Sequence, residues 1–217
     1  MLDIEIVEGE SPLKVEPQQV DQRSEEWFAL RLGKITGSRF PKLMNSSKKK
    51  IDEFTDSQLT ILKELAVERM TGERTDFYSN KYMEWGTETE PLAIAHYEGL
   101  NWCKVQEVGF YPFGDFGDSP DGITEDRAIE VKCPKSTTHL DYLIDPKKLF
   151  NTYKWQCYGH MIATGLKQCD LISYDPRFTD EAKRMVIYNI QFEQEEADKL
   201  MERLNLCEAK IKEFCNA

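Results

Sequence analysis

Hydrophobic side chains recur at intervals of three and four residues in two long stretches of the chain, a spacing that is typical of amphipathic helices. The first stretch begins at Thr55 or Asp56, either of which can cap a helix, and ends before Gly72. Its apolar positions are Leu59, Leu62, Ala66 and Met70. The second stretch covers residues 193–215, and its inward-facing positions are Leu200, Leu204, Ile211 and Phe214. Both stretches are therefore expected to be helices that pack on a core.

Shorter helix-like and strand-like patterns fill the rest of the chain. Helices are predicted over residues 24–32, with Ser24 as the N-cap and Gly33 as the stop, over 79–99 and over 146–165. Alternating apolar and polar positions predict strands over residues 103–113, 115–124, 127–133, 169–175 and 184–192. The first three of these strands are expected to form one meander, residues 45–50 a loop, and residues 1–22 a flexible arm. This order of elements predicts an α/β fold.

Composition narrows the class of protein. A chain of 217 residues with 40% hydrophobic content can bury one sizeable core, so a single domain over residues 1–217 is expected. No apolar run has the length of a membrane span, and the acidic N-terminus differs from a signal peptide, which favours a cytoplasmic protein. The six cysteines form no CxxC pair, so reduced thiols are expected rather than a structural zinc site or an iron–sulfur cluster.

The formal net charge of −11 argues against nucleic-acid binding, because proteins that bind phosphate usually carry a basic surface. The basic residues are nevertheless grouped. One group comprises Arg31, Lys34, Arg39, Lys42, Lys48, Lys49 and Lys50, and the other comprises Lys132, Lys135, Lys147, Lys148 and Lys154. Charge is therefore expected to be segregated over the surface, so the net value does not exclude a nucleic-acid substrate.

Acidic and basic side chains meet where two predicted strands follow each other. Side chains alternate along a strand, so Glu130 and Lys132 should project together while Val131 points into the core with its carbonyl near the same edge. The turn-prone segment Ser119-Pro120-Asp121-Gly122 can aim Asp121 at that edge. Two carboxylates and a carbonyl are hard oxygen ligands that suit Mg²⁺. The pattern predicts the site of a metal-dependent phosphodiesterase.

Each of these features also has a simpler interpretation. Asp121, Glu130 and Lys132 could belong to an ordinary solvated hairpin. Glu90 could close a capping box with Thr87, Arg31 could pair with Glu25 or Glu26, and Gln156 could satisfy a backbone group. The histidines at positions 96, 139 and 160 show no partner pattern, so they are interpreted as packing or surface residues.

Four blocks in this order resemble the lambda-exonuclease family, also called the YqaJ viral recombinase family, of the PD-(D/E)xK nuclease superfamily. They are Trp27-x-x-x-Arg31-x-Gly33-x-Ile35-Thr36-Gly37-Ser38, Trp85-Gly86-x-x-x-Glu90-Pro91, the pair Ser119-Pro120-Asp121-Gly122 and Glu130-Val131-Lys132, and Tyr153-x-x-Gln156-x-x-x-x-Met161-x-x-Thr164-Gly165. Together they span residues 27–165. The resemblance implies a restriction-endonuclease-like core with a central mixed sheet flanked by helices.

The resemblance also implies roles for single residues. Asp121, Glu130 and the Val131 carbonyl would hold a catalytic Mg²⁺, for which Mn²⁺ could substitute, and Glu90 would help to place a second ion. Lys132 would orient or deprotonate the attacking water, and its pKa is expected to fall readily beside cations and on burial. By the same resemblance Arg31 and Ser38 would bind a terminal 5′-phosphate, and Gln156 would contact the substrate or water near the metals.

The function implied is a Mg²⁺-dependent 5′→3′ exonuclease that degrades one strand of linear duplex DNA to mononucleotides and leaves a 3′ single-stranded tail. Such enzymes serve phage-type recombination with a single-strand annealing protein. The family also forms homotrimeric rings around DNA, which would place Lys48, Lys49 and Lys50 near the central hole. A PD-(D/E)xK endonuclease of restriction or repair type and a non-catalytic module that binds DNA ends or a partner are the alternatives.

Overall fold

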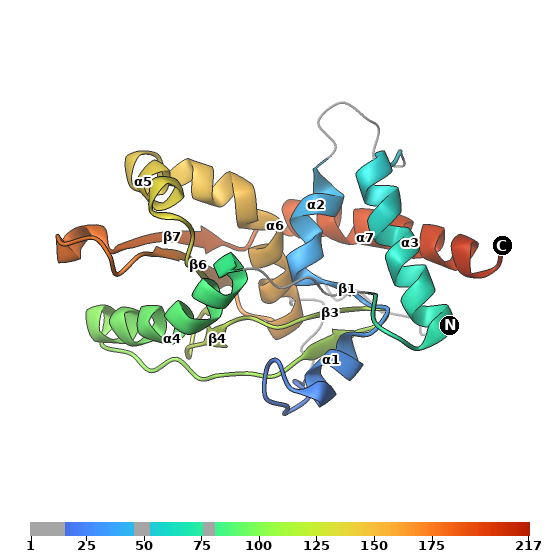
Figure 1. Cartoon of the computed structure of the whole chain (residues 1–217), viewed down its shortest axis with the longest axis horizontal. Coiled ribbons are helices and arrows are strands. Elements are labelled where there is room, and N and C mark those ends of the chain that lie inside the picture. Colours follow the sequence, from blue (N-terminus) through green and yellow to red (C-terminus); the bar gives the residue numbers. More distant parts are fainter. Residues whose placement is uncertain (1–15, 46–52, 76–80) are drawn as a thin grey trace.

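The computed structural model describes residues 16–45, 53–75 and 81–217, and its strands form two sheets (Figure 1). The smaller sheet has the order β1-β3-β2, with β1 parallel and β2 antiparallel to β3. The larger sheet has the order β4-β5-β6-β7, and only its central pair is parallel. The strands are β1 (Ile35–Thr36), β2 (Tyr111–Phe113), β3 (Phe116–Asp118), β4 (Gly122–Ile123), β5 (Ala128–Lys132), β6 (Gln168–Tyr174) and β7 (Met185–Gln191). The larger sheet is therefore mixed, as predicted.

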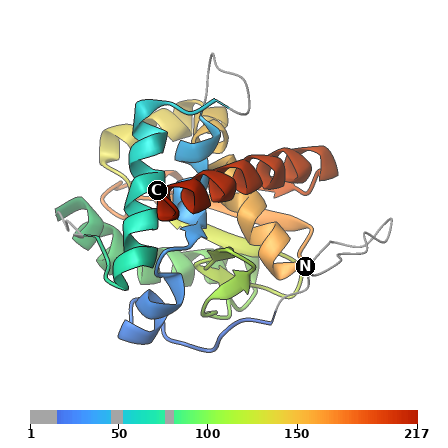
Figure 2. The ribbon, with the colours of Figure 1, turned by 90° about the vertical axis from the view of Figure 1, so that its right-hand side faces the viewer.

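Helices surround the two sheets. They are α1 (Glu25–Arg31), η1 (Gly37–Arg39), α2 (Phe40–Met44), α3 (Asp56–Thr71), α4 (Lys81–Asn101), α5 (Ser136–Ile144), α6 (Pro146–Thr164), η2 (Glu181–Lys183) and α7 (Gln194–Cys215). One apolar cluster joins α4 to alternate positions of β5 and β6, namely Ala93, Tyr97, Ile129, Val131, Ile172 and Tyr174. The main core joins the opposite face of these strands to α6 and α7, and α3 crosses α7 and packs against it (Figure 2).

Local sequence signals set several of the helix ends. The Ser24 hydroxyl accepts a hydrogen bond from the Trp27 amide at 3.2 Å, and Thr55 forms a capping box with Gln58. Gly72 ends α3 in the left-handed conformation, with φ of 70°. The five predicted helices are thus confirmed to within a few residues. Within α3, Leu62 and Ala66 are buried as the spacing implies, but Met70 is 57% exposed.

Consecutive segments of the predicted meander do pair antiparallel, with a further bridge between Gln106 and Ile123, but they are divided between the two sheets. The strands β2 and β3 pair with each other in the smaller sheet, whereas β4 and β5 begin the larger one. The break falls at Pro120, which has no amide hydrogen to donate to a ladder. The chain therefore passes from one sheet to the other immediately before Asp121. This transition places the candidate carboxylate at the junction of the two sheets.

Two further expectations differ from the structure. Residues 16–22 are not a free arm, because Gln18 pairs with Phe110 in an antiparallel bridge and Gln22 donates hydrogen bonds to the carbonyls of Val108 and Pro120. Helix α5 was not predicted, since Leu140 and Ile144 are exposed and the helix buries His139 and Tyr142 instead. The arm's residues 1–15 and the loop's residues 46–50 lie outside the described part of the chain. No helix among the described residues is long and apolar enough to cross a membrane.

Candidate active site

Strand β5 places Glu130 and Lys132 on one face of the larger sheet. Glu130 is 1% exposed and Val131 is 6% exposed, and Val131 belongs to the apolar cluster on the other face. The Lys132 ammonium forms an ion pair with Oε1 of Glu130 and lies 4.9 Å from the centre of the Tyr153 ring. The alternation predicted from the sequence is confirmed, and the interpretation as a solvated hairpin is wrong because Glu130 is buried.

Asp121 reaches the same strand from the turn after Pro120. Its amide donates to the Ile129 carbonyl at 3.0 Å, and its Oδ2 accepts from the Val131 amide at 2.7 Å. Burial raises the pKa of Asp121 well above its usual range, and the negative charges of Glu130 and Glu90 raise it further. Three carboxylates therefore act on one another across this edge of the sheet.

Glu90 joins the group from the middle of α4. Its Oε2 accepts a hydrogen bond of 2.6 Å from the Arg23 guanidinium, which lies just before α1. Burial raises the pKa of Glu90, and the positive charge of Arg23 opposes that rise. The capping-box alternative is wrong, because Thr87 lies inside the helix and its hydroxyl donates to the Met83 carbonyl.

The charge states of Glu130 and Lys132 depend on each other. Burial opposes the ionisation of Glu130, but Lys132 and His160 outweigh it and lower the pKa of this carboxyl. Burial likewise lowers the pKa of Lys132, but Glu130 and Asp121 raise it more, so the net shift is upward. The protein groups alone therefore keep Lys132 charged at neutral pH, and a pKa lowered beside bound cations stays a prediction.

His160 also contacts this group, a position that the sequence interpretation did not predict. It is fully buried on α6, where its Nδ1 lies 2.7 Å from Oδ2 of Asp118 and its Nε2 lies 2.6 Å from Oε2 of Glu130. Burial lowers the pKa of His160, but the two carboxylates raise it well above its usual value. The sequence did contain an indication of this position, because His160 follows the predicted site residue Gln156 by four residues and thus shares its helix face. The packing interpretation is confirmed for His139, which is buried, and for His96, which lies beside the Tyr174 ring.

Gln156 lies on the same helix and is 8% exposed. Its side chain forms no hydrogen bond with any residue that the structure describes, so the alternative that it satisfies a backbone group is not supported. Cys133, three residues after Glu130, is partly buried, and burial raises the pKa of its thiol to about 12. The thiol is therefore protonated at neutral pH and is a poor metal ligand.

The carboxylates suit a hard divalent cation by their chemistry, although they do not form a finished ligand shell. No group of three His, Cys, Asp or Glu side chains within the described ranges is arranged to hold an ion directly. Glu90 is turned to Arg23, and Glu130 to Lys132 and His160. Burial first, and then repulsion by Glu130 and Glu90, raise the pKa of Asp121, and a bound cation would offset both effects. The donor set fits Mg²⁺ or Mn²⁺ if Arg23 and Lys132 release the carboxylate oxygens that they now hold.

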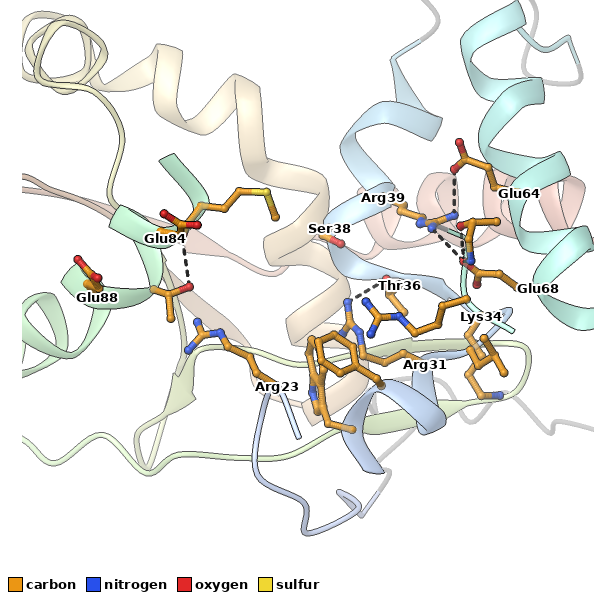
Figure 3. Close-up of a pocket in the computed structure, with 17 residues that line it drawn as sticks. Arg23, Arg31, Lys34, Thr36, Ser38, Arg39, Glu64, Glu68, Glu84 and Glu88 are labelled. Atoms are coloured by element: carbon orange, nitrogen blue, oxygen red, sulfur yellow. Dashed lines mark hydrogen bonds and ion pairs between the residues drawn. The ribbon is translucent and has the colours of Figure 1, made fainter. Parts of the chain in front are cut away.

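A pocket of about 770 Å³ adjoins this group, between α1, η1, α3 and the start of α4 (Figure 3). Its basic lining residues are Arg23, Arg31, Lys34, Arg39 and Arg74, and its acidic ones are Glu64, Glu68, Glu84 and Glu88. Ser38 also lines it, so the structure brings together the two residues predicted to bind an end phosphate. Arg23 belongs to both the pocket and the carboxylate group, since it contacts Glu90.

Arg31 points from α1 toward the middle of the pocket (Figure 3). Its guanidinium lies 3.9 Å from the centre of a Trp27 ring and donates to the Thr36 hydroxyl at 3.2 Å. Within the described residues it forms no ion pair with Glu25 or Glu26, so that alternative is wrong. Burial lowers the pKa of Arg31 to about 10, Asp118 opposes the shift, and Arg39 and Arg74 add to it. The pocket thus holds a poorly neutralised guanidinium.

The comparisons with known proteins agree with this geometry. Residues 26–167 match the family model described as the YqaJ-like viral recombinase domain. The crystal structure of the alkaline exonuclease LHK-Exo from Laribacter hongkongensis is 31% identical and covers 89% of this chain and 95% of its own, with a TM-score of 0.79. Its complex with dAMP is 32% identical over the same shares of the two chains, with a TM-score of 0.78. These likenesses confirm the predicted nuclease core.

A more distant structure shows the same fold. A phage related exonuclease from Haemophilus somnus 129PT is 19% identical, covers 84% of this chain and 95% of its own, and has a TM-score of 0.70. No curated protein matches the chain.

Proposed function

The chain belongs to the YqaJ-like viral recombinase family and is a DNA exonuclease, and from this premise we propose that it is a Mg²⁺-dependent 5′→3′ enzyme. We infer that it degrades one strand of linear duplex DNA to mononucleotides and leaves a 3′ single-stranded tail. The observation that carries the proposal is the contact between Arg23 and Glu90, which joins the Arg31 pocket directly to the carboxylate group. A terminal phosphate and a scissile phosphate can then be bound side by side.

We assign the metal-binding role to Asp121, Glu130 and the Val131 carbonyl, with Glu90 helping to place a second ion. These groups would hold Mg²⁺ or Mn²⁺, which would supply activation of water and neutralisation of the charge that develops on the phosphate. The oxygens for this role come from rigid elements, because Glu130 and Val131 lie on β5 and Glu90 lies inside α4. The group therefore needs little rearrangement of the backbone to bind an ion.

Lys132 holds its proton firmly while Glu130 and Asp121 face it. In that state its ammonium can orient a water molecule or donate a hydrogen bond to a phosphate oxygen. It can accept a proton as a base only after positive charge near the carboxylates has lowered its pKa. Gln156 lies one turn before His160 on α6, and its unengaged amide is available to the substrate or to water near the metals.

Binding of the DNA end in the pocket would determine the direction in which the enzyme degrades the strand. Arg31 would bind a terminal 5′-phosphate through its planar fork, and Ser38 would add a hydroxyl donor. An endonuclease of restriction or repair type needs no such pocket, and the family relationship supports an exonuclease. The same relationship leaves the non-catalytic alternative without support.

We further propose a homotrimer that encloses DNA and supplies its 3′ tails to a single-strand annealing protein in the bacterial cytoplasm. A closed threefold ring would let an acidic protein keep its basic residues toward the DNA. Lys48, Lys49 and Lys50, predicted to line the hole, lie outside the described residues. Light scattering at micromolar protein should give the mass of three chains. A strictly monomeric particle that degrades long duplex without dissociating would exclude the ring.

Labelled DNA tests the enzymatic proposal. Linear duplex with a 5′-phosphate, linear duplex with a 5′-hydroxyl and closed circular duplex should be incubated with Mg²⁺ or EDTA, with each strand labelled separately. We expect mononucleotides from the 5′ end of phosphorylated linear duplex and no cleavage of the circle or in EDTA. Asp121→Asn should be inactive, whereas Asp126→Asn, in the turn between β4 and β5, should be active because Asp126 is exposed and pairs with Arg127. Cleavage of circular DNA or release of label from 3′ ends would contradict the proposal.

A further inference from the structure

A buried row of three side chains lies behind the proposed metal ligands. His160 stands between Asp118 and Glu130 and contacts one oxygen of each, at 2.7 Å and 2.6 Å. All three side chains are almost completely buried, with 0% exposure for His160 and 2% and 1% for the two carboxylates. Buried charges of this kind are costly unless each is paired, and here the imidazole is the shared partner of both carboxylates.

Close backbone contacts fix the far end of this row. Oδ1 of Asp118 accepts a hydrogen bond of 2.9 Å from the Ser119 amide, so both of its oxygens are engaged. A Cβ atom at Gly37 would collide with the Asp118 carboxylate, and one at Gly159 would lie 2.9 Å from its Oδ2. Only glycine leaves room for Asp118 at these two positions. The carboxylate is thus held from η1, from β3 and from α6.

Contacts at the near end of the row fix the orientation of the Glu130 carboxylate. Its Oε2 is taken by His160, and its Oε1 faces Lys132. A cation that binds Glu130 therefore has to replace Lys132 at one oxygen and can leave the bond to His160 intact. Because both oxygens of Glu130 are engaged, the plane of its carboxylate has little freedom to turn. Hydrogen bonds that orient a ligand in this way commonly contribute to metal affinity.

We propose that His160 is a positioning residue that, together with Asp118, holds Glu130 in the orientation required to bind the catalytic cation. The inference rests on the proposed function, because it assigns Glu130 to the metal. It adds two residues, His160 and Asp118, that touch neither the substrate nor the ion.

The test compares two buried histidines. His160→Gln removes the bridge between the two carboxylates. His139→Gln is the matched control, because His139 is also 0% exposed and both its ring nitrogens are engaged, with Ser173 and with the Lys183 carbonyl, and neither contacts Glu130. Mn²⁺ binding without DNA should be measured by calorimetry, and the rate of DNA cleavage should be measured as a function of Mg²⁺ concentration. Thermal unfolding of each variant reports the purely structural cost.

We expect His160→Gln to weaken Mn²⁺ binding about 10- to 100-fold and to raise the Mg²⁺ concentration for half-maximal rate by a similar factor. His139→Gln should lower thermal stability but leave both metal dependences at the wild-type values. Equal metal dependence in folded His160→Gln and wild type would overturn the inference. If His160→Gln does not fold, Asp118→Asn decides, since it keeps the size of the side chain and must weaken Mn²⁺ binding in the same direction.

The same measurements distinguish an error in the proposed function from an error in the role of His160. A wild-type protein that neither binds Mn²⁺ nor cleaves DNA with a divalent cation would defeat the assignment of Glu130 to a metal. A wild-type protein that does both, while His160→Gln and Asp118→Asn match it, would defeat only the positioning role.

Discussion

Replacement of Arg31 by methionine should separate the stability of this protein from its recognition of DNA ends. The guanidinium lies in a pocket beside Arg39 and Arg74, and the pKa of Arg31 falls to about 10 from its ordinary 12.5. A base whose pKa is lower in the folded state than in the unfolded chain makes folding less favourable while it is protonated. A difference of this size corresponds to an upper limit of about 3 kcal/mol at neutral pH.

The contacts of Arg31 offset that cost. Its stacking on Trp27 contributes about 0.5–2 kcal/mol, and its hydrogen bond to Thr36 contributes about 1 kcal/mol. The free energy of unfolding of Arg31→Met should therefore lie within about 1 kcal/mol of the wild-type value. Loss of a charged hydrogen bond to a terminal phosphate costs about 1.5–3 kcal/mol, which lowers the preference for 5′-phosphate over 5′-hydroxyl ends about 10- to 150-fold.

Competition binding in EDTA measures this preference without cleavage, and urea denaturation measures stability. Lys34→Met is the matched control, because Lys34 lines the same pocket but donates to the Gly114 carbonyl. It removes one positive charge and should weaken binding to both kinds of end by the same small factor. If Arg31→Met destabilises the protein by more than about 3 kcal/mol and weakens both ends equally, Arg31 supports the fold and the reasoning is wrong.

Three further predictions concern other buried charges. Lys132→Ala should slow cleavage at least about 100-fold on a gel while circular dichroism stays unchanged, and near-normal cleavage would exclude its catalytic role. Arg203→Met should lower the free energy of unfolding in urea by about 3–5 kcal/mol, because Arg203 is 2% exposed and donates to three oxygens around α2 and α3. Burial opposes the ionisation of Asp175, but Arg177 and Ser136 outweigh it and lower the pKa of this carboxyl in the folded protein. Ionised Asp175 therefore stabilises the fold at pH values above its pKa in the unfolded chain, and this stabilisation is lost as the pH falls through its pKa in the folded protein. Asp175→Asn should accordingly be less stable than wild type at pH 7, and the gap in melting temperature should close below about pH 4.

Local rules were sufficient for the parts of the site that lie close together in the sequence. The period of two along β5 predicted that Glu130 and Lys132 share a face, and the proline and glycine around Asp121 predicted a turn there. The helix caps at Ser24 and Thr55 were predicted for the same reason, since a cap depends on residues three positions apart. The resemblance to a nuclease family then supplied Glu90, Arg31, Ser38 and Gln156, which no local pattern connects.

Pairings between distant residues could not be predicted from the sequence. His160 meets Glu130 across 30 positions and Asp118 across 42, and Arg23 meets Glu90 across 67. Neither the hydrophobic period nor the spacing of residues in the sequence predicts such contacts, because they depend on how α6 and α4 pack on the sheet. The division of the predicted meander between two sheets was missed for a related reason. The residues around Pro120 have strand-like composition on both sides, and only the tertiary structure shows that the two sides belong to different sheets.

The net charge of −11 is compatible with this pocket because charge acts on a phosphate mainly over short distances. At physiological ionic strength the screening length is about 8 Å, so acidic side chains on remote surfaces have little effect on Arg31. A terminal phosphate carries close to two negative charges at neutral pH, whereas a phosphodiester within the duplex carries one. A largely buried guanidinium with like-charged neighbours gains more from the former than from the latter. We therefore expect selection of DNA ends to depend on local contacts in the pocket, and the acidic residues Glu84 and Glu88 on its α4 side to discourage weaker binding along the duplex.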